Sequence, residues 1–561
     1  MRFYTNIQNL GNKILVKETV DGERKRYRTS YSPSLFYEVK EKTSHRSLDG
    51  KYLRKVKFPD ISSARAKIKE NDGILSFYGM TQFVYPYIAD NYSDLEFDLE
   101  KIRIATLDIE VECENGFPNP LEAIERVNAI TLKYDDMYTV LGLGDWENTN
   151  ESLSHLNIKY YKCTSEIELL KSFLNLWEAA DIDVVTGWNV NQFDMSYLVN
   201  RITKILGESN TKRLSPWGIV DRMQKNIRGQ LQEQVNVLGI TIVDYLDLYR
   251  KFTYVTRESY RLDHIAFVEL GERKLDHSEF SHMHLFYKED YQKYIDYNIK
   301  DVELVDRMED KMGLITLCLT MAYQGGVNYG DTFGVTSIWE SIIHRYLYAN
   351  KTAIPFYENK IKSDYPGGYV KDPMVGLHEN VVSFDLNSLY PSLIMQYNMS
   401  TETIANGEVM NVDIEKLLDG YEFQNPGKAI GGNGQLFRTD KKGFMPTLVD
   451  GMYSERVEIK QEMIQAQKEL QKVDKKDKQA LYGIEKRINI AENRQMAIKI
   501  LLNSLYGAMG NKYFRFFDQR IAEAITLSGQ LTIRWAEVAI NKYMQSILKT
   551  KKDYVIAIDT D

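Results

Sequence analysis

Hydrophobic and polar positions change their pattern several times along this chain of 561 residues. Near the N-terminus, short strand-like runs alternate with turn signals such as Asp21-Gly22 and Asp49-Gly50. From Lys101 the order of strand, loop and helix is typical of an α/β unit, and a second such stretch is expected from about Tyr365. Apolar residues over 481–505 keep helical spacing, which predicts a long antiparallel helical hairpin; a surface helical pair with a charged tip explains that spacing equally well.

Composition narrows the class of protein. With 43% hydrophobic and 27% charged residues, the chain is globular rather than disordered, and its length suggests about three or four domains. No apolar run is long enough to span a membrane and no secretory signal opens the chain, so we expect an intracellular protein without a membrane partner. Cys113, Cys163 and Cys318 lack metal-binding spacing and should be free thiols. The net charge is −8, yet residues 441–520 carry 16 basic and 10 acidic residues, so positive charge is concentrated there.

Three segments place acids where a metal-dependent site could form. Asp108 and Glu110 alternate on a strand-like run and share one face, and two acids within an apolar strand favour a hard divalent cation. Asp194 lies at a predicted strand-to-helix transition. Tyr297 and Asp301 share one face of a predicted helix. Taken singly, a chance pair, a helix N-cap and an ion-paired helix surface explain these acids as well.

A second set of residues suits a nucleoside triphosphate. Asp385 ends a buried strand predicted over 381–385, where metal-bridged phosphates could be held. The other candidates are a cation, an amide and a phenol on one helix face, two cations on the preceding helix, and two acids on a closing strand: Lys499, Asn503, Tyr506, Arg456, Lys460, Asp559 and Asp561.

In this order the segments resemble the motifs of a known family. Asp-x-Glu, Asn-x-x-x-Phe-Asp and Tyr-x-x-x-Asp look like the three motifs of DEDDy-type 3′→5′ proofreading exonucleases. Asp-Leu-Asn-Ser-Leu-Tyr-Pro-Ser at 385–392, Lys-Ile-Leu-Leu-Asn-Ser-Leu-Tyr-Gly at 499–507 and Asp-Thr-Asp at 559–561 resemble motifs A, B and C of family B DNA polymerases. Tyr-Pro-Gly-Gly-Tyr at 365–369 resembles their template-contacting element. The likeness is closest to T4-like phage replicative polymerases, although Ala557-Ile558 replaces the usual Tyr-Gly before motif C.

The resemblance implies two active sites, each with two Mg²⁺ ions for which Mn²⁺ can substitute. In the exonuclease, Asp108, Glu110, Asp194 and Asp301 bind the ions and Tyr297 positions water. In the polymerase, Asp385, Asp561 and the Leu386 carbonyl hold the ions, and Asp559 is a supporting acid. The nucleotide is bound by Arg456, Lys460, Lys499, Asn503, Ser388, Leu389, Tyr390 (which excludes a ribose 2′-OH) and Tyr506, and the template is contacted by Tyr365, Gly367 and Gly368.

The same resemblance implies a multidomain α/β fold with an RNase H-like exonuclease, a palm and helical fingers, and with the thumb absent. The expected domains are an N-terminal domain at 1–102 with 314–356 packed on it, an exonuclease at 103–313, palm at 357–442, fingers at 443–511 and further palm at 512–561.

Template-directed DNA synthesis with proofreading for phage DNA replication, in the cytoplasm of a bacterial host, is the function this resemblance implies. The implied partners are primer-template DNA, dNTPs, a second polypeptide carrying the remaining palm and thumb, and a sliding clamp bound through it. An incomplete or truncated chain is the alternative to such a division. Two other functions stay open: an exonuclease alone, and a noncatalytic template- or RNA-binding subunit.

Overall fold

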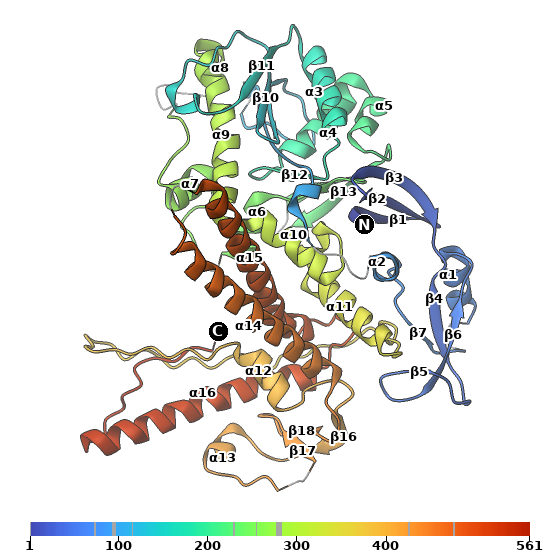
Figure 1. Cartoon of the computed structure of the whole chain (residues 1–561), viewed down its shortest axis with the longest axis vertical. Coiled ribbons are helices and arrows are strands. Elements are labelled where there is room, and N and C mark those ends of the chain that lie inside the picture. Colours follow the sequence, from blue (N-terminus) through green and yellow to red (C-terminus); the bar gives the residue numbers. More distant parts are fainter. Residues whose placement is uncertain are drawn as a thin grey trace. The chain divides into compact units, whose positions relative to one another are not determined.

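The computed structural model describes residues 2–560 except 72–73, 93–96, 115, 228–229, 254, 277–282, 425–426 and 475–476. The chain divides into two compact units (Figure 1). The first comprises Met1–Tyr31, Tyr87–Tyr323 and Val327–Phe333; the second comprises Ser32–Pro86, Gln324–Gly326 and Gly334–Asp561. Within the described ranges, none of the helices combines the length and apolar character needed to cross a bilayer, and all three cysteines are free thiols, as predicted.

A six-stranded sheet organises the first unit, in the order β11-β10-β9-β8-β12-β15. Its strands are β8 (Ile104–Val111), β9 (Val127–Tyr134), β10 (Met137–Gly142), β11 (Ile158–Lys162), β12 (Val184–Thr186) and β15 (Thr241–Ile242). The central strand β8 runs antiparallel to β9 and parallel to β12. A three-stranded sheet of β1 (Arg2–Leu10), β2 (Lys13–Val20) and β3 (Glu23–Ser30) and a hairpin of β13 (Val220–Ile227) and β14 (Gln230–Val237) complete the strands of this unit.

Helices cover both faces of the six-stranded sheet. Leu107 and Ile109 of β8 point into a core shared with α3 (Glu166–Ala180) and α4 (Asp194–Leu206). Residues of β9 and β10 pack on the other face against α9 (Tyr291–Met312). Because side chains alternate along a strand, the acids of β8 share the face that α9 covers. The unit also contains α5 (Glu208–Thr211), α6 (Tyr245–Phe252), α7 (Leu262–Leu270) and α8 (Met283–Glu289), with most of α10 (Leu314–Gly325) and the short helices η1 (Leu99–Lys101), η2 (Glu151–Leu153), η3 (Lys212–Leu214) and η4 (Tyr329–Phe333).

Local sequence explains where α9 begins and ends. The Asp290 carboxylate accepts a hydrogen bond from the Lys293 amide and caps the N-terminus, and Gly313 takes the left-handed conformation (φ 62°) that ends the helix. The helix predicted around Tyr297 and Asp301 is therefore confirmed.

The second unit combines small sheets with long helices. Its strands are β4 (Ser34–Glu38), β5 (His45–Arg46), β6 (Tyr52–Lys57) and β7 (Phe77–Tyr78) in one sheet, and β16 (Ile404–Val409), β17 (Lys428–Ile430) and β18 (Gln435–Arg438) in another. Its helices are α1 (Ile61–Glu70), α11 (Val335–Ala349), α12 (Leu389–Gln396), α13 (Ile414–Leu418), α14 (Phe444–Leu470), α15 (Lys478–Met509) and α16 (Gln519–Leu548), and α2 (Val84–Asn91) begins in this unit and ends in the first.

The predicted helical hairpin is confirmed. Helices α14 and α15 pack on each other (Figure 1), and Asp477 caps α15 by accepting a hydrogen bond from the Ala480 amide. Apolar positions such as Ile498, Leu502 and Leu505 are buried, as their helical spacing predicted.

The strand predicted over 381–385 is wrong, and the mixture of helices and strands expected from about Tyr365 begins only at α12. Residues 357–388 form neither helix nor strand apart from an isolated bridge between Lys371 and Ile558. Val382 and Phe384 are 70% and 78% exposed rather than buried. A strand needs a neighbour to receive its backbone hydrogen bonds, and no described strand pairs with these residues.

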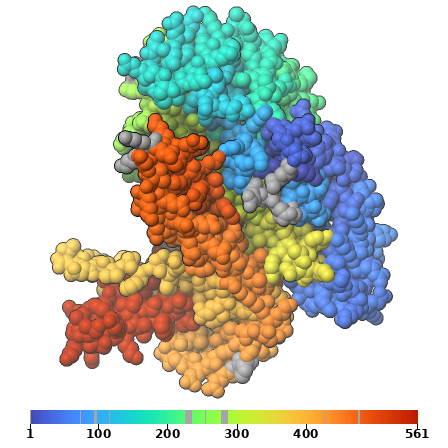
Figure 2. Space-filling view, viewed as in Figure 1, coloured from blue at the N-terminus to red at the C-terminus, as the bar shows by residue number. Residues whose placement is uncertain are grey.

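The same segment projects as a narrow arm beside α16 within its unit (Figure 2). Lys371 forms ion pairs of 2.5 Å with Glu537 of α16 and with Asp553 in the segment after this helix, and Gln530 of α16 donates a hydrogen bond to the Gly367 carbonyl. In place of the predicted closing strand, residues 554–560 form an isolated bridge at Ile558, and the Ile556 carbonyl accepts a hydrogen bond from the Met374 amide. Few backbone contacts therefore hold the arm and the segment 554–560 in place.

Candidate functional site

The acids predicted on β8 meet an acid from α9. Ligand oxygens of Asp108, Glu110 and Asp301 all lie within 4.8 Å of one another. Asp108 and Glu110 project from the same face of the central strand, and α9 crosses that face carrying Asp301. Residues separated by almost two hundred positions in the sequence therefore form one carboxylate cluster, the only such group among the described residues.

Asp194, from the segment that follows β12, contacts the same strand, β8. It is the first residue of α4, which follows β12, and its Oδ1 accepts a hydrogen bond of 3.0 Å from the Ile109 amide, between the two β8 acids. The alternative role as an N-cap does not hold, because Phe193 occupies that position. Gly187 permits the close approach, since a Cβ there would lie 2.3 Å from the Leu107 carbonyl oxygen.

Burial and mutual repulsion alter the protonation of these acids. Loss of solvent, followed by repulsion from neighbouring carboxylates, raises the pKa of Glu110 to about 8 and that of Asp108 well above its usual range. Burial likewise raises the pKa of Asp194 to about 8, against the hydrogen bond from Ile109. Such a cluster needs cationic compensation to be fully ionised, and an all-oxygen donor set suits Mg²⁺ or Mn²⁺ rather than a soft metal. The residues therefore fit a divalent cation.

Tyr297 and Asp301 do share one face of α9, and both contact a lysine that the sequence motifs do not contain. The Lys274 ammonium donates a hydrogen bond of 3.0 Å to the Tyr297 hydroxyl, forms an ion pair with Asp301, and lies 4.8 Å from the centre of the Tyr297 ring. Burial, then the neighbouring Asp301 charge, raises the pKa of Tyr297, so the phenol keeps its proton. Lys274 lies in the loop after α7, and no spacing signal in the sequence connects it to the site.

A second residue outside the predicted set holds the loop that leads to Asp194. The Asp244 carboxylate accepts hydrogen bonds of 3.0 Å from the Asn189 and Asn191 amides and also caps α6. Burial raises the pKa of Asp244 to about 7. Asp244 stands directly before α6, and an acid in that position is typical of an N-cap. Its second function, fixing a loop from another segment, required the structure.

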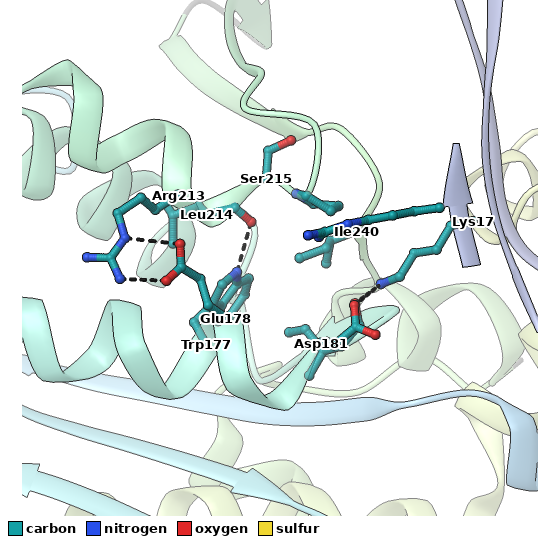
Figure 3. Close-up of a pocket in the computed structure, with 11 residues that line it drawn as sticks. Lys17, Trp177, Glu178, Asp181, Arg213, Leu214, Ser215 and Ile240 are labelled. Carbon is teal, nitrogen blue, oxygen red and sulfur yellow. Dashed lines mark hydrogen bonds and ion pairs between the residues drawn. The ribbon is translucent and has the colours of Figure 1, made fainter. Parts of the chain in front are cut away.

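A cavity of about 300 Å³ in the same unit is distinct from the carboxylate cluster (Figure 3). It is lined by residues of β2, β3, α3 and the segment 213–216. Lys17 pairs with Asp181 at 3.3 Å, and Arg213 pairs with Glu178 at 2.5 Å. Since these charged groups already neutralise one another, we assign no ligand to this cavity.

In the second unit, three tyrosines from the polymerase-like motifs come together. The rings of Tyr390 (α12) and Tyr506 (α15) lie 4.7 Å apart, and the hydroxyls of Tyr365 and Tyr506 are 3.5 Å apart. A Cβ on Gly529 of α16 would lie 2.8 Å from the Tyr390 ring, so that helix passes directly beside it. Motifs A and B and the Tyr-x-Gly-Gly element are thereby joined.

The Tyr-x-Gly-Gly element also contacts motif C. The Thr560 hydroxyl donates a hydrogen bond of 2.5 Å to the Tyr369 carbonyl, and a Cβ on Gly368 would lie 2.8 Å from that hydroxyl. Gly367 is exposed and its carbonyl accepts from α16. Asp561 lies outside the described residues.

The other predicted polymerase residues are not brought into one cluster by any described contact. Arg456 is half-buried and donates a hydrogen bond of 3.2 Å to Gln495, between the two helices of the hairpin. Ser388 has a left-handed conformation (φ 49°) at the start of α12, beside half-buried Leu389. The remaining described residues of the predicted polymerase site are exposed: Asp385, Leu386, Lys460, Lys499, Asn503 and Asp559.

Comparison with known proteins agrees with the motifs. A family model described as DNA polymerase family B matches residues 334–560, and one described as DNA polymerase family B, exonuclease domain, matches residues 83–265. The chain is 31% identical to the DNA-directed DNA polymerase of Escherichia phage RB69 and 30% identical to that of Enterobacteria phage T4, in each case over all of this chain and 69% of the relative. The DNA polymerase of Thermococcus gorgonarius is 25% identical over 84% of this chain and 55% of its own length.

Motif order, the carboxylate cluster and these relatives lead to one assignment. The chain belongs to the family B DNA polymerases, as an enzyme that carries both an exonuclease domain and a polymerase domain.

Proposed function

We propose that the chain extends primers on a DNA template and removes misincorporated nucleotides from the 3′ end by metal-dependent hydrolysis, in phage DNA replication within a bacterial host. The observation that carries the exonuclease assignment is the cluster of half-buried Asp108 and Glu110 with buried Asp301. The carboxylates repel one another and Lys274 compensates only part of their charge, so a divalent cation would compensate the rest.

In the exonuclease, Asp108, Glu110, Asp194 and Asp301 would hold two Mg²⁺ ions. When bound, such ions lower the pKa of a water and stabilise the leaving oxygen of the 3′ nucleotide. The Tyr297 phenol stays protonated and would donate its hydrogen bond to the attacking water. Lys274 holds the phenol in place and balances part of the charge of Asp301.

At the polymerase motifs the proposal rests on resemblance, because the described acids there form no cluster. Asp385, Asp561 and the Leu386 carbonyl would bind two Mg²⁺ ions, with Asp559 as a supporting acid. The basic residues of the α14–α15 hairpin and the tyrosines described above would bind the incoming dNTP. Tyr365, Gly367 and Gly368 would contact the template. The segment that contains them forms hydrogen bonds with both motif C and α16.

We also propose the domain boundaries given above: an N-terminal domain at 1–102 with 314–356, an exonuclease at 103–313, palm at 357–442 and 512–561, and fingers at 443–511. The two family models, at 83–265 and 334–560, support a division between exonuclease and polymerase.

A second polypeptide that supplies palm and thumb, and through it a sliding clamp, remains part of the proposal. Its support is the exposed apolar surface of α16 and the arm, where Trp535 and Val538 are 63% and 55% exposed and Val375 is fully exposed. Affinity purification from infected cells should recover a polypeptide that increases primer extension. Extension unaffected by every co-purifying chain would exclude this partner.

One assay separates the proposed activities. The chain is incubated with Mg²⁺, dNTPs and a labelled primer-template carrying a mismatched 3′ end, and Asp108→Ala and Asp385→Ala are compared with the wild type. Primer shortening that only Asp108→Ala abolishes supports the exonuclease, and extension that only Asp385→Ala abolishes supports the polymerase. Shortening without extension would favour an exonuclease-only chain, which the exposed position of Asp385 makes the second candidate. Neither reaction would leave nucleic-acid binding alone.

A further inference from the structure

We infer that Asn298 and Thr131 position the carboxylate of Asp108 for metal binding, an inference that rests on the proposed exonuclease function. Asn298 follows Tyr297 on α9, which packs against β8 and β9. Its Nδ2 donates a hydrogen bond of 2.6 Å to Oδ2 of Asp108, and its Oδ1 accepts one of 2.5 Å from the Thr131 hydroxyl. Both side chains are completely buried.

Hydrogen-bond chemistry fixes the direction of this chain of contacts. An Asp108 carboxylate that binds a cation is ionised and only accepts, so the amide nitrogen of Asn298 must face Asp108 and its oxygen must face Thr131. The Thr131 hydroxyl then donates to the amide oxygen, while the accept-only carboxylate disfavours a flipped amide. Thr131 is paired with Asp108 between strands β8 and β9. The register of the sheet therefore places the two residues that Asn298 connects.

The contact engages only one oxygen of Asp108. No described donor reaches its Oδ1, which leaves that oxygen for a cation. A carboxylate held by an outer hydrogen bond does not need to be oriented when the metal binds, and loss of such partners typically lowers metal affinity or activity about 10- to 100-fold. Asn298 and Thr131 are therefore positioning residues, which act through Asp108.

The test measures Mn²⁺ binding directly, by the electron paramagnetic resonance of free Mn²⁺, in an Asp385→Ala background that removes the principal polymerase acid. Asn298→Leu should weaken binding about 10- to 100-fold, and Thr131→Val should weaken it in the same direction but less. Thr131→Ser keeps the hydroxyl and should restore wild-type binding. The Mn²⁺ concentration for half-maximal excision should shift in parallel.

Asn150→Leu is the matched control. Asn150 donates a hydrogen bond of 3.1 Å from its amide to another α9 carboxylate, Asp296, which is outside the cluster. It should leave Mn²⁺ binding unchanged.

The inference is overturned if folded Asn298→Leu, or folded Thr131→Val should Asn298→Leu fail to fold, binds Mn²⁺ as the wild type does. An Asp108→Ala arm distinguishes this from failure of the proposed function. If Asp108→Ala abolishes binding and excision while the positioning variants change nothing, only the inference fails. If excision survives Asp108→Ala, the exonuclease assignment itself fails and the inference with it.

Discussion

The contact between Lys274 and Tyr297 predicts that the two residues act as one unit in excision. The ammonium donates a 3.0 Å hydrogen bond to a phenol that is 8% exposed, so the bond is charged and largely shielded from solvent. Hydrogen bonds to charged groups contribute about 1.5–3 kcal/mol. If Tyr297 positions the attacking water only while Lys274 holds it, that energy corresponds to about a 10- to 150-fold loss of excision rate, at about 1.4 kcal/mol for each factor of ten.

A double-mutant cycle measures this coupling. Lys274→Met, Tyr297→Phe and the double variant are compared in single-turnover excision of a labelled single strand at saturating Mg²⁺. We expect each single variant to be slow and the double variant to be little slower than Lys274→Met, which gives a coupling energy of about 1.5–3 kcal/mol. Rate losses that simply add would refute the reasoning, because they would show that the two side chains act independently.

Lys300→Met provides a matched control for the loss of a buried ion pair. Lys300 lies on α9, the helix that carries Tyr297. Its side chain is 7% exposed, and it pairs with Glu303 at 2.6 Å. Like Lys274→Met, it removes a shielded ammonium and should lower thermal stability. Unlike Lys274→Met, it should leave the excision rate of the folded enzyme unchanged, and a comparable rate loss in both variants would point to a general loss of structure.

Three further predictions concern stability and nucleotide choice. Burial, then the charges of Arg515 and Arg345, lowers the pKa of His344 to about 4. Between about pH 6.5 and 4 the unfolded chain therefore binds a proton at His344 more readily than the folded chain does, and the free energy of unfolding should fall on acidification by up to about 3 kcal/mol. Hydrogen exchange of α11 measures this fall. His344→Phe should remove this part of the pH dependence, and an unchanged pH profile in that variant would contradict the prediction. Arg201→Met leaves its 2.7 Å partner Glu166 buried and uncompensated, so it should cost about 3–5 kcal/mol in denaturant unfolding, more than the double variant with Glu166→Met; equal losses would argue against a buried ion pair. Tyr390→Ala opens space beside Tyr506 and should raise ribonucleotide incorporation relative to dNTPs by about 10- to 100-fold in single-nucleotide extension; unchanged selectivity would exclude Tyr390 as the sugar filter.

The elements with strong periodicity were predictable. Helix α9 and the α14–α15 hairpin follow from apolar spacing and from capping residues such as Asp290 and Asp477. The shared face of Asp108 and Glu110 followed from strand alternation alone. Their meeting with Asp301 did not, because it depends on which face of the sheet α9 covers; the motif resemblance provided that expectation, and the carboxylate cluster confirms it.

Other features of the fold and the site cannot be predicted from local sequence patterns. Lys274 is a lysine in a loop, and its burial beside Asp301 results from packing between segments that the sequence does not relate. The apolar run ending at Asp385 has strand-like composition, yet strand formation depends on a pairing neighbour, which the described residues do not supply. The roles of the polymerase residues stay predictions.

The hydrogen bond between Asp194 and the Ile109 amide has a consequence for the sheet itself. Pairing between β8 and β12 ends at Thr106 and Thr186, and beyond that point a side-chain carboxylate takes the place that backbone carbonyls occupy elsewhere in the ladder. Had β12 continued, the amide of Ile109 would face another strand and no acid could enter between Asp108 and Glu110. The carboxylate cluster therefore lies at an interruption in the sheet, and the short length of β12 is what admits Asp194 beside the acids of β8.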